Sequence, residues 1–98
     1  MPDYLLLMHN DATQSEKDED WGAYLAGLRE SGKFDGGSAI GTGVCVRKSG
    51  AVPDVADHLT GFLRVRAGDL QEAVRLVTGN PVYEAGGTVE IRELPRTG

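Results

Sequence analysis

A histidine and an aspartate stand where an apolar run ends near the start of the chain. The stretch YLLLMHND, residues 4–11, takes five apolar residues directly into His9, Asn10 and Asp11. A histidine oriented by a carboxylate is a general base that works near neutral pH, and strand ends often carry functional side chains. We therefore identify His9 and Asp11 as a candidate catalytic pair. The alternative is that Asn10 and Asp11 only form the turn that ends a strand.

Three arginines and a glutamate form a second candidate site, because alternation places them on one face of two predicted strands. Residues 61–67 read GFLRVRA and residues 86–94 read GGTVEIREL. Apolar and polar side chains alternate in both, which is typical of a strand with one buried face. The charged residues on the face away from the apolar rows are Arg64, Arg66, Glu90 and Arg92. They could bind an anionic ligand or form a cross-strand ladder of ion pairs, and the sequence leaves both open.

The other chemically competent side chains give weaker signals. Asp54, Asp57 and His58 form an acid–histidine cluster in a loop, where adjacent side chains point to opposite faces, so a solvated loop is the favoured interpretation. His9 and His58 are far apart in sequence and lack the spacing of metal ligands, so no metal site is predicted. Cys45 is the single cysteine and has no disulfide partner. The glycine-rich segment before it lacks the pattern of a nucleotide-binding loop, and we predict no cofactor.

The size and charge of the chain narrow the class of protein. Its 98 residues suit one domain, residues 1–98, with a modest core. A net charge of −5 argues against nucleic-acid binding, which needs a basic surface. The longest apolar run is too short to span a membrane and no secretion signal is visible, so we expect no membrane association. A single cysteine fits a reducing compartment, and a cytoplasmic location is predicted.

Strands and helices in a definite order should position these side chains. The run YLLLM is apolar at every position, as in a central strand covered on both faces. A helix capped by Thr13 or Ser15 is expected next. Its apolar stripe, which we expect in the core, consists of Trp21, Tyr24, Leu25 and Leu28. Short strands are predicted at residues 38–40 and 44–48.

A second helix gives the strongest local signal. Asp69 is its predicted cap, Glu72 completes a capping box, and Gly79 ends it. The predicted buried stripe consists of Leu70, Ala73, Val74 and Val77. With the closing strand, the order becomes strand, helix, two or three strands, helix, strand. That order predicts an α+β protein with the ferredoxin-like βαββαβ arrangement.

Taken in order, these stretches resemble the YCII-related family and, within it, the branch called DGPF-domain proteins. The similarity covers nearly the whole chain and is carried by YLLLMH, by LTGFLRVRAGDLQEAVRL and, most specifically, by the closing NPVYEAGGTVEIRELP. The branch is named for an Asp-Gly-Pro-Phe motif before the third main strand. That place reads VPDVADHLTGF here, where Asp54 or Asp57 could stand for the aspartate and the other three residues are absent. Some family members also carry a histidine on the first helix, and this chain has none there.

The resemblance implies a homodimer in which two sheets pack through their helix-free faces into a dimeric α/β barrel that encloses a cavity. The residues also favour a dimer, because Phe62 and Leu94 join an apolar central strand on the face that no helix covers. Some relatives are enzymes with lyase or isomerase chemistry. The resemblance therefore implies a site for a small polar or anionic metabolite.

In an enzyme of this kind, His9 would be the base, Asp11 its orienter, and Arg64 and Arg66 the anion-binding groups. The alternative is a non-catalytic binding or regulatory module. Relatives encoded beside alternative sigma factors suggest a sigma-factor association for such a module. Whether the protein is an enzyme is left open by the sequence.

Overall fold

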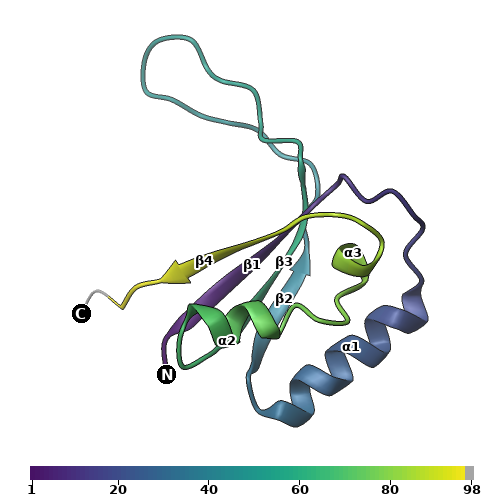
Figure 1. Ribbon diagram of the computed structural model, residues 1–98. Coiled ribbons are helices and arrows are strands. Elements are labelled where there is room, and N and C mark those ends of the chain that lie inside the picture. Colours follow the sequence, from purple (N-terminus) through teal and green to yellow (C-terminus); the bar gives the residue numbers. More distant parts are fainter. Residues whose placement is uncertain (97–98) are drawn as a thin grey trace.

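The computed structural model describes residues 1–96 and has helices on one face of a four-stranded antiparallel sheet (Figure 1). Its elements are β1 (Asp3–His9), α1 (Asp18–Ser31), β2 (Phe34–Ala39), β3 (Leu59–Arg66), α2 (Leu70–Arg75), α3 (Pro81–Glu84) and β4 (Val89–Leu94). The strands lie side by side in the order β2-β3-β1-β4. This order and the helices on one face confirm the predicted ferredoxin-like α+β fold.

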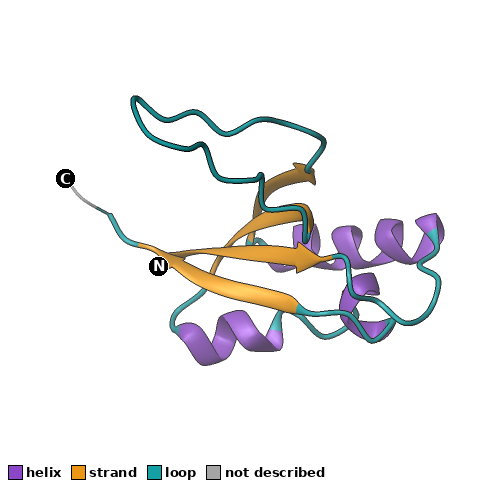
Figure 2. Cartoon of the chain, turned by 90° about the horizontal axis from the view of Figure 1, so that it is seen from above, coloured by secondary structure: helices purple, strands orange, loops and turns teal. Residues whose placement is uncertain are grey.

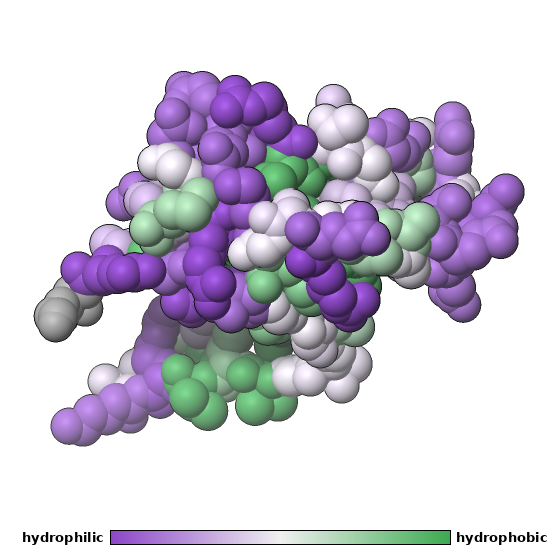
Figure 3. Space-filling view, turned by 90° about the horizontal axis from the view of Figure 1, so that it is seen from below, coloured by the Kyte–Doolittle hydropathy of each residue, from purple (hydrophilic) through white to green (hydrophobic). Residues whose placement is uncertain are grey.

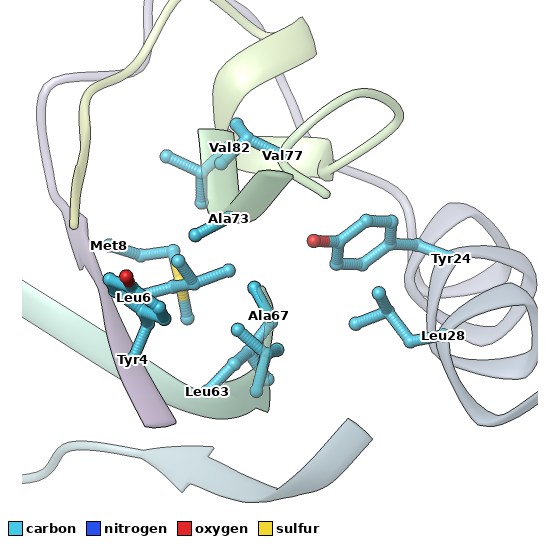
Figure 4. Packing of buried hydrophobic residues seen from close by; sticks show 11 residues of the cluster. Tyr4, Leu6, Met8, Tyr24, Leu28, Leu63, Ala67, Ala73, Val77 and Val82 are labelled. Carbon is cyan, nitrogen blue, oxygen red and sulfur yellow. The ribbon is translucent and has the colours of Figure 1, made fainter. Parts of the chain in front are cut away.

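Strand β1 lies inside the sheet and divides its side chains between two environments. It pairs antiparallel with β3 on one side and with β4 on the other. Tyr4, Leu6 and Met8 are buried on the helix side, and Leu6 has no exposed surface. The core around them includes Leu28, Leu63, Ala73, Val77 and Val82 (Figure 4). Leu5 and Leu7 point to the opposite face and are only partly buried.

Helix α1 covers the core with its predicted stripe but begins later than expected. The buried or partly buried residues of the stripe are Trp21, Tyr24, Leu25 and Leu28. The helix starts at Asp18, and Lys17 at its N-cap makes no side-chain hydrogen bond, so the prediction that Thr13 or Ser15 caps it is wrong. Thr13 is held elsewhere, because its backbone N–H and its hydroxyl both donate to the carbonyl of Ala85, at 2.9 and 3.2 Å.

The start of helix α2 has the predicted cap, but the predicted capping box is wrong, because the Glu72 side chain binds Gly68 and Lys33 and not the backbone N–H of Asp69. The side chain of Asp69 accepts a hydrogen bond from the backbone N–H of Glu72 at 2.8 Å, which confirms Asp69 as the cap. Glu72 in turn accepts from the backbone N–H of Gly68 at 3.2 Å and from the Lys33 ammonium at 2.8 Å. The Glu72 carboxylate thus ties the start of α2 to the segment between α1 and β2.

The predicted second helix ends earlier than the expected stop at Gly79, and a separate helical turn follows that stop. Helix α2 ends at Arg75, and Asn80 caps the separate turn α3. Within the predicted stripe, Ala73 and Val77 are buried, whereas Leu70 and Val74 are 47% and 50% exposed. A helix of six residues packs only about one turn against the sheet, so Leu70 and Val74 lie outside the packed surface between α2 and the sheet.

Replacing Glu72 with glutamine is expected to lower the melting temperature by a few degrees near neutral pH. The hydrogen bonds from the Lys33 side chain and the Gly68 backbone hold the pKa of the Glu72 carboxyl below its ordinary value of 4.5. Such a carboxyl stabilises the fold above its unfolded pKa, and this contribution is lost as the pH falls through the folded pKa. The gap between parent and Glu72→Gln should therefore close as the pH drops below 4.5, as followed by thermal melts.

A matched control is Glu30→Gln, because Glu30 is exposed on α1 and has no ion pair among residues 1–96. That variant should melt with the parent at every pH. A Glu72→Gln deficit that stays constant down to about pH 3 would show that the carboxylate's charge is not the source of the stability.

Residues 40–57, which we call the arm, leave the sheet after β2 and return at β3. The arm projects beyond the sheet in Figure 1, and Figure 2 shows it on the side of the sheet opposite the helices. It contains no strand, so the strand predicted at residues 44–48 is wrong. The alternation of Val44, Cys45 and Val46 is real, but no neighbouring strand pairs with it. The arm contributes to a radius of gyration of 14.9 Å, above the roughly 13 Å typical of a 100-residue domain.

The arm exposes aliphatic side chains that the described chain does not cover. Val44 and Val46 are 85% and 89% exposed. The large aliphatic side chains exposed on the arm are Ile40, Val44, Val46, Val52 and Val55. Figure 3 shows hydrophobic surface on this outlying segment, in the lower part of the view.

Within residues 1–96, no helix has both the length and the apolar character that crossing a bilayer requires.

Candidate functional site

His9 ends strand β1 on the helix-free face of the sheet, where the regular pairing with β3 stops. A β-bulge follows Met8, and the backbone N–H of His9 donates to the carbonyl of Thr88 at 3.0 Å. This bond ties the end of β1 to the start of β4. The His9 side chain is 20% exposed, so it is mostly buried but still reaches solvent.

Glu90 is the carboxylate that binds His9. Nε2 of His9 lies 2.9 Å from Oε1 of Glu90, and Oε2 of Glu90 accepts from Arg92 Nη1 at 3.1 Å. These hydrogen bonds, first that with His9 and then that with Arg92, hold the pKa of the Glu90 carboxyl below its ordinary value. An ionised carboxylate only accepts, so Nε2 of His9 carries the proton and Nδ1 is the basic nitrogen.

Asp11 does not bind His9 in the structure. Its carboxylate accepts from the backbone N–H and the hydroxyl of Thr88, at 2.8 and 2.6 Å. These bonds, the hydroxyl first, hold the pKa of the Asp11 carboxyl below its ordinary value. The sequence-based prediction that Asp11 orients His9 is therefore corrected. Asp11 connects the loop after β1 to Thr88, the residue before β4, and the carboxylate beside His9 is that of Glu90.

His58 joins this site from the base of the arm. The ring centroids of His9 and His58 are 4.9 Å apart, with an angle of 78° between the planes. The backbone holds the pair together, because the N–H of Asn10 donates to the His58 carbonyl at 2.8 Å and its side chain donates to the Asp57 carbonyl at 3.0 Å. Asp54 and Asp57 are exposed, and the ion pair of His9 is with Glu90 instead.

Sequence reasoning missed the approach of His58 to His9, although a signal existed. In an antiparallel pair, the end of one strand lies beside the start of the other. His9 ends β1 and His58 immediately precedes β3, so pairing these strands brings the two imidazoles together.

Arg64 and Arg66 lie on the helix-free face, as predicted, and each has an acidic partner. Arg64 contacts Asp3 at 3.1 Å and Asp35 at 3.3 Å, and Arg66 contacts Asp35 at 3.2 Å. The side chains of Arg64 and Arg66 are 44% and 46% exposed. These contacts cross from β3 to β1 and to β2 and form a cross-strand ladder of ion pairs, whereas the Arg92–Glu90 pair lies within β4. They leave each arginine with surface open to a ligand.

A cleft of about 790 Å³ lies elsewhere, on the helix side of the molecule. It runs between α1 and the α2–α3 segment, and its charged lining residues are Glu16, Lys17, Asp20, Arg75 and Glu84. None of the residues around His9 or Arg64 contributes to it. The cleft is therefore separate from the site at the end of β1.

The family model of the YCII-related domain matches residues 3–96. The chain belongs to the YCII-related family. No curated protein matches this YCII-related chain. A solved structure that does resemble it is the 5-chloro-2-hydroxyhydroquinone dehydrochlorinase TftG from Burkholderia phenoliruptrix AC1100, in complex with 2,5-dihydroxybenzoquinone. The likeness has a TM-score of 0.54 at 17% identity and covers 97% of this chain and 95% of the other, which supports the ferredoxin-like fold.

Proposed function

We propose that this YCII-related protein binds a small polar or anionic metabolite on the helix-free face of its sheet and catalyses proton transfer of the isomerase or lyase type. The observation that carries the proposal is the chain of contacts from Arg92 through Glu90 to His9. A base oriented by a carboxylate, which is itself held by a third group, is the arrangement that activates side chains in many acid–base enzymes.

In this mechanism Nδ1 of His9 takes a proton from a carbon of the bound metabolite. Glu90 stabilises the imidazolium that forms, because its carboxylate lies 2.9 Å from Nε2. The electron pair left on the substrate carbon then moves. His9 either returns the proton to another atom of the substrate, or the electron pair expels a leaving group and His9 releases its proton to solvent. The first outcome is an isomerisation and the second is an elimination.

The distance between His9 and Arg64 limits the shape of the ligand. Arg64 pairs with Leu5 across the sheet, four residues from His9 along β1. At roughly 3.3 Å per residue, the two backbones are about 13 Å apart. A metabolite whose anionic group binds Arg64 must therefore extend along the strand toward His9. Arg66 lies further along and would bind the same anionic end.

The structural resemblance supports this reaction class without identifying the substrate. The name of TftG describes removal of hydrogen chloride from a hydroxylated aromatic ring. Such an elimination requires a proton acceptor, which is the role proposed here for His9. The hydroxyquinone bound to TftG is also acidic, and 2,5-dihydroxybenzoquinone is therefore a reasonable first probe for this protein.

A thermal-shift screen of 2,5-dihydroxybenzoquinone and small metabolite carboxylates and phosphates tests the proposal. An anionic ligand present at 100 times its dissociation constant should raise stability by about 2.7 kcal/mol. Arg64→Ala should reduce the ligand-induced shift, because Arg64 offers bidentate hydrogen bonds to an anion. Arg75→Ala is the matched control, since Arg75 lies in α2 on the helix side and should leave the shift unchanged.

The shift caused by ligand, rather than the melting temperature itself, is the quantity to compare. Removing Arg64 also leaves the buried Asp3 with a weaker partner, Arg96 at 3.6 Å, so the unliganded variant should already melt lower. If Arg64→Ala responds to anions as the parent does, or if only neutral compounds raise the melt, the arginines form a structural ladder and the anion site is wrong.

A non-catalytic binding or regulatory module is the second candidate. The acidic partners Asp3 and Asp35 favour it, because they already balance part of the charge of Arg64 and Arg66. A ligand found in this screen that the protein leaves chemically unchanged on incubation, and that His9→Gln binds as tightly as the parent, would support this alternative. A sigma-factor partner, membership of the DGPF branch and a cytoplasmic location remain predictions from the sequence.

A further inference from the structure

Two imidazoles and a carboxylate from three separate segments meet at the end of β1. His9 comes from β1, His58 from the base of the arm and Glu90 from β4. One ligand atom from each side chain lies within 4.8 Å of the other two. This convergence is produced by the fold alone, because the three residues are widely separated along the chain.

Hydrogen bonds fix the backbone behind each of these three side chains. The N–H of His9 donates to Thr88, and the carbonyl of His58 accepts from Asn10. Glu90 is part of β4 and pairs with Leu7 of β1. The second oxygen of Glu90 is already held by Arg92 at 3.1 Å, as carboxylate ligands of metals are often held by an outer hydrogen bond.

We propose that His9, His58 and Glu90 bind a divalent transition-metal cation, with Zn²⁺ as the best-fitting ion. Two imidazole nitrogens and one carboxylate oxygen are a donor set that suits zinc and its neighbours, whereas magnesium and calcium prefer oxygen ligands alone. Three protein ligands leave a fourth position of a zinc site open to water or to a ligand. His58 is exposed, so an ion can reach the site from solvent.

The proposed ion and the proposed base would exclude each other. In the ion-free protein, the Nε2–H group of His9 donates a hydrogen bond to Glu90. A cation bound between the two side chains would take the place of the proton in that hydrogen bond. His9 could then no longer be oriented by Glu90 as a general base. The metal proposal goes beyond the proposed function and does not depend on it, because ion binding is measured without any substrate.

Calorimetric titration of the chelator-treated, tag-free protein with Zn²⁺ tests the inference directly. The expected result is one ion per chain, with an affinity that falls by about 10- to 100-fold or more in His58→Ala, since even outer-shell substitutions weaken metal sites by that factor. Asp57→Ala, which changes the adjacent residue outside the cluster, should bind as the parent does. All proteins should carry Cys45→Ser, so that the single thiol cannot supply a competing ligand.

Circular dichroism shows whether His58→Ala keeps its fold, and Glu90→Gln provides a second test that preserves the size of the side chain. The proposal is overturned if the parent takes up no Zn²⁺ at millimolar concentration. It is equally overturned if His58→Ala or Glu90→Gln, correctly folded, binds as tightly as the parent, or if Asp57→Ala weakens binding as much as His58→Ala does. None of these outcomes bears on the anion screen, so the two proposals fail independently.

Discussion

Light scattering on the purified protein is expected to give a mass twice the 10.4 kDa of one chain. The arm exposes five large aliphatic side chains, and it stands on the helix-free side of the sheet (Figure 2). That face also carries the partly buried Leu5, Leu7 and Phe62. A second copy packed on this face would cover both surfaces at once, and twofold pairing is the commonest assembly of soluble proteins. Sheets packed face to face would also enclose the arginines and His9 in the barrel proposed for the family.

A charge placed at the centre of this face should convert the dimer to a monomer. Leu7 lies between Phe62 of β3 and Glu90 of β4, so Leu7→Lys introduces an ammonium group where the partner sheet would pack. Val74→Lys is the matched control, because Val74 is 50% exposed on α2, on the helix side. A parent of 10.4 kDa at micromolar concentration would contradict the dimer, and a Leu7→Lys variant that keeps a dimeric parent's mass would contradict this face as the interface.

Leu6→Ala is expected to produce the largest loss of stability of any single leucine truncation in β1. Leu6 is fully buried in the interior strand, and truncation of such a residue costs about 2 to 5 kcal/mol. Each kcal/mol lowers the melting temperature of a domain this size by about 4 to 8 °C, so the variant should melt far below the parent. Thermal melts at equal protein concentration measure the effect, since dimerisation makes the melting temperature depend on concentration.

The same truncation on the surface provides the comparison. Leu70 is 47% exposed, so Leu70→Ala removes much less buried area and should lower the melt only slightly. Equal losses in the two variants would mean that Leu6 does not occupy the packed centre of the protein.

Local patterns in the sequence were sufficient to predict the order of the elements and the two faces of the sheet. Alternation placed Arg64 and Arg66 opposite Leu63 and Val65, and the structure confirms those faces. The sequence also predicts the helix cap at Asp69, because that cap depends only on Asp69 and Glu72, three positions apart. These features need no information about distant parts of the chain.

The predictions that failed concern features that depend on contacts between residues far apart in the sequence. The start of α1 depends on Thr13 binding Ala85, and the partner of His9 depends on the pairing of β1 with β4. The segment at residues 44–48 alternates like a strand, but a strand needs a neighbour and the arm has none in this chain. The acidic partners of Arg64 were overlooked for the same reason, since Asp3 and Asp35 reach it across the sheet.

The pairing of β1 with β4 has a consequence for how the chain folds during synthesis. Residues 3–8 form part of the first strand, yet one of their two neighbours is residues 89–94, nearly the whole chain away. Contacts between residues this distant in sequence slow folding. Before the partner strand is in place, the unpaired edge of an apolar strand can also form hydrogen bonds with other chains. During synthesis, β1 therefore lacks one of its two neighbouring strands until residues 89–94 have been added to the chain. Until then, the edge of β1 that β4 will cover is a site where the incomplete chain can aggregate.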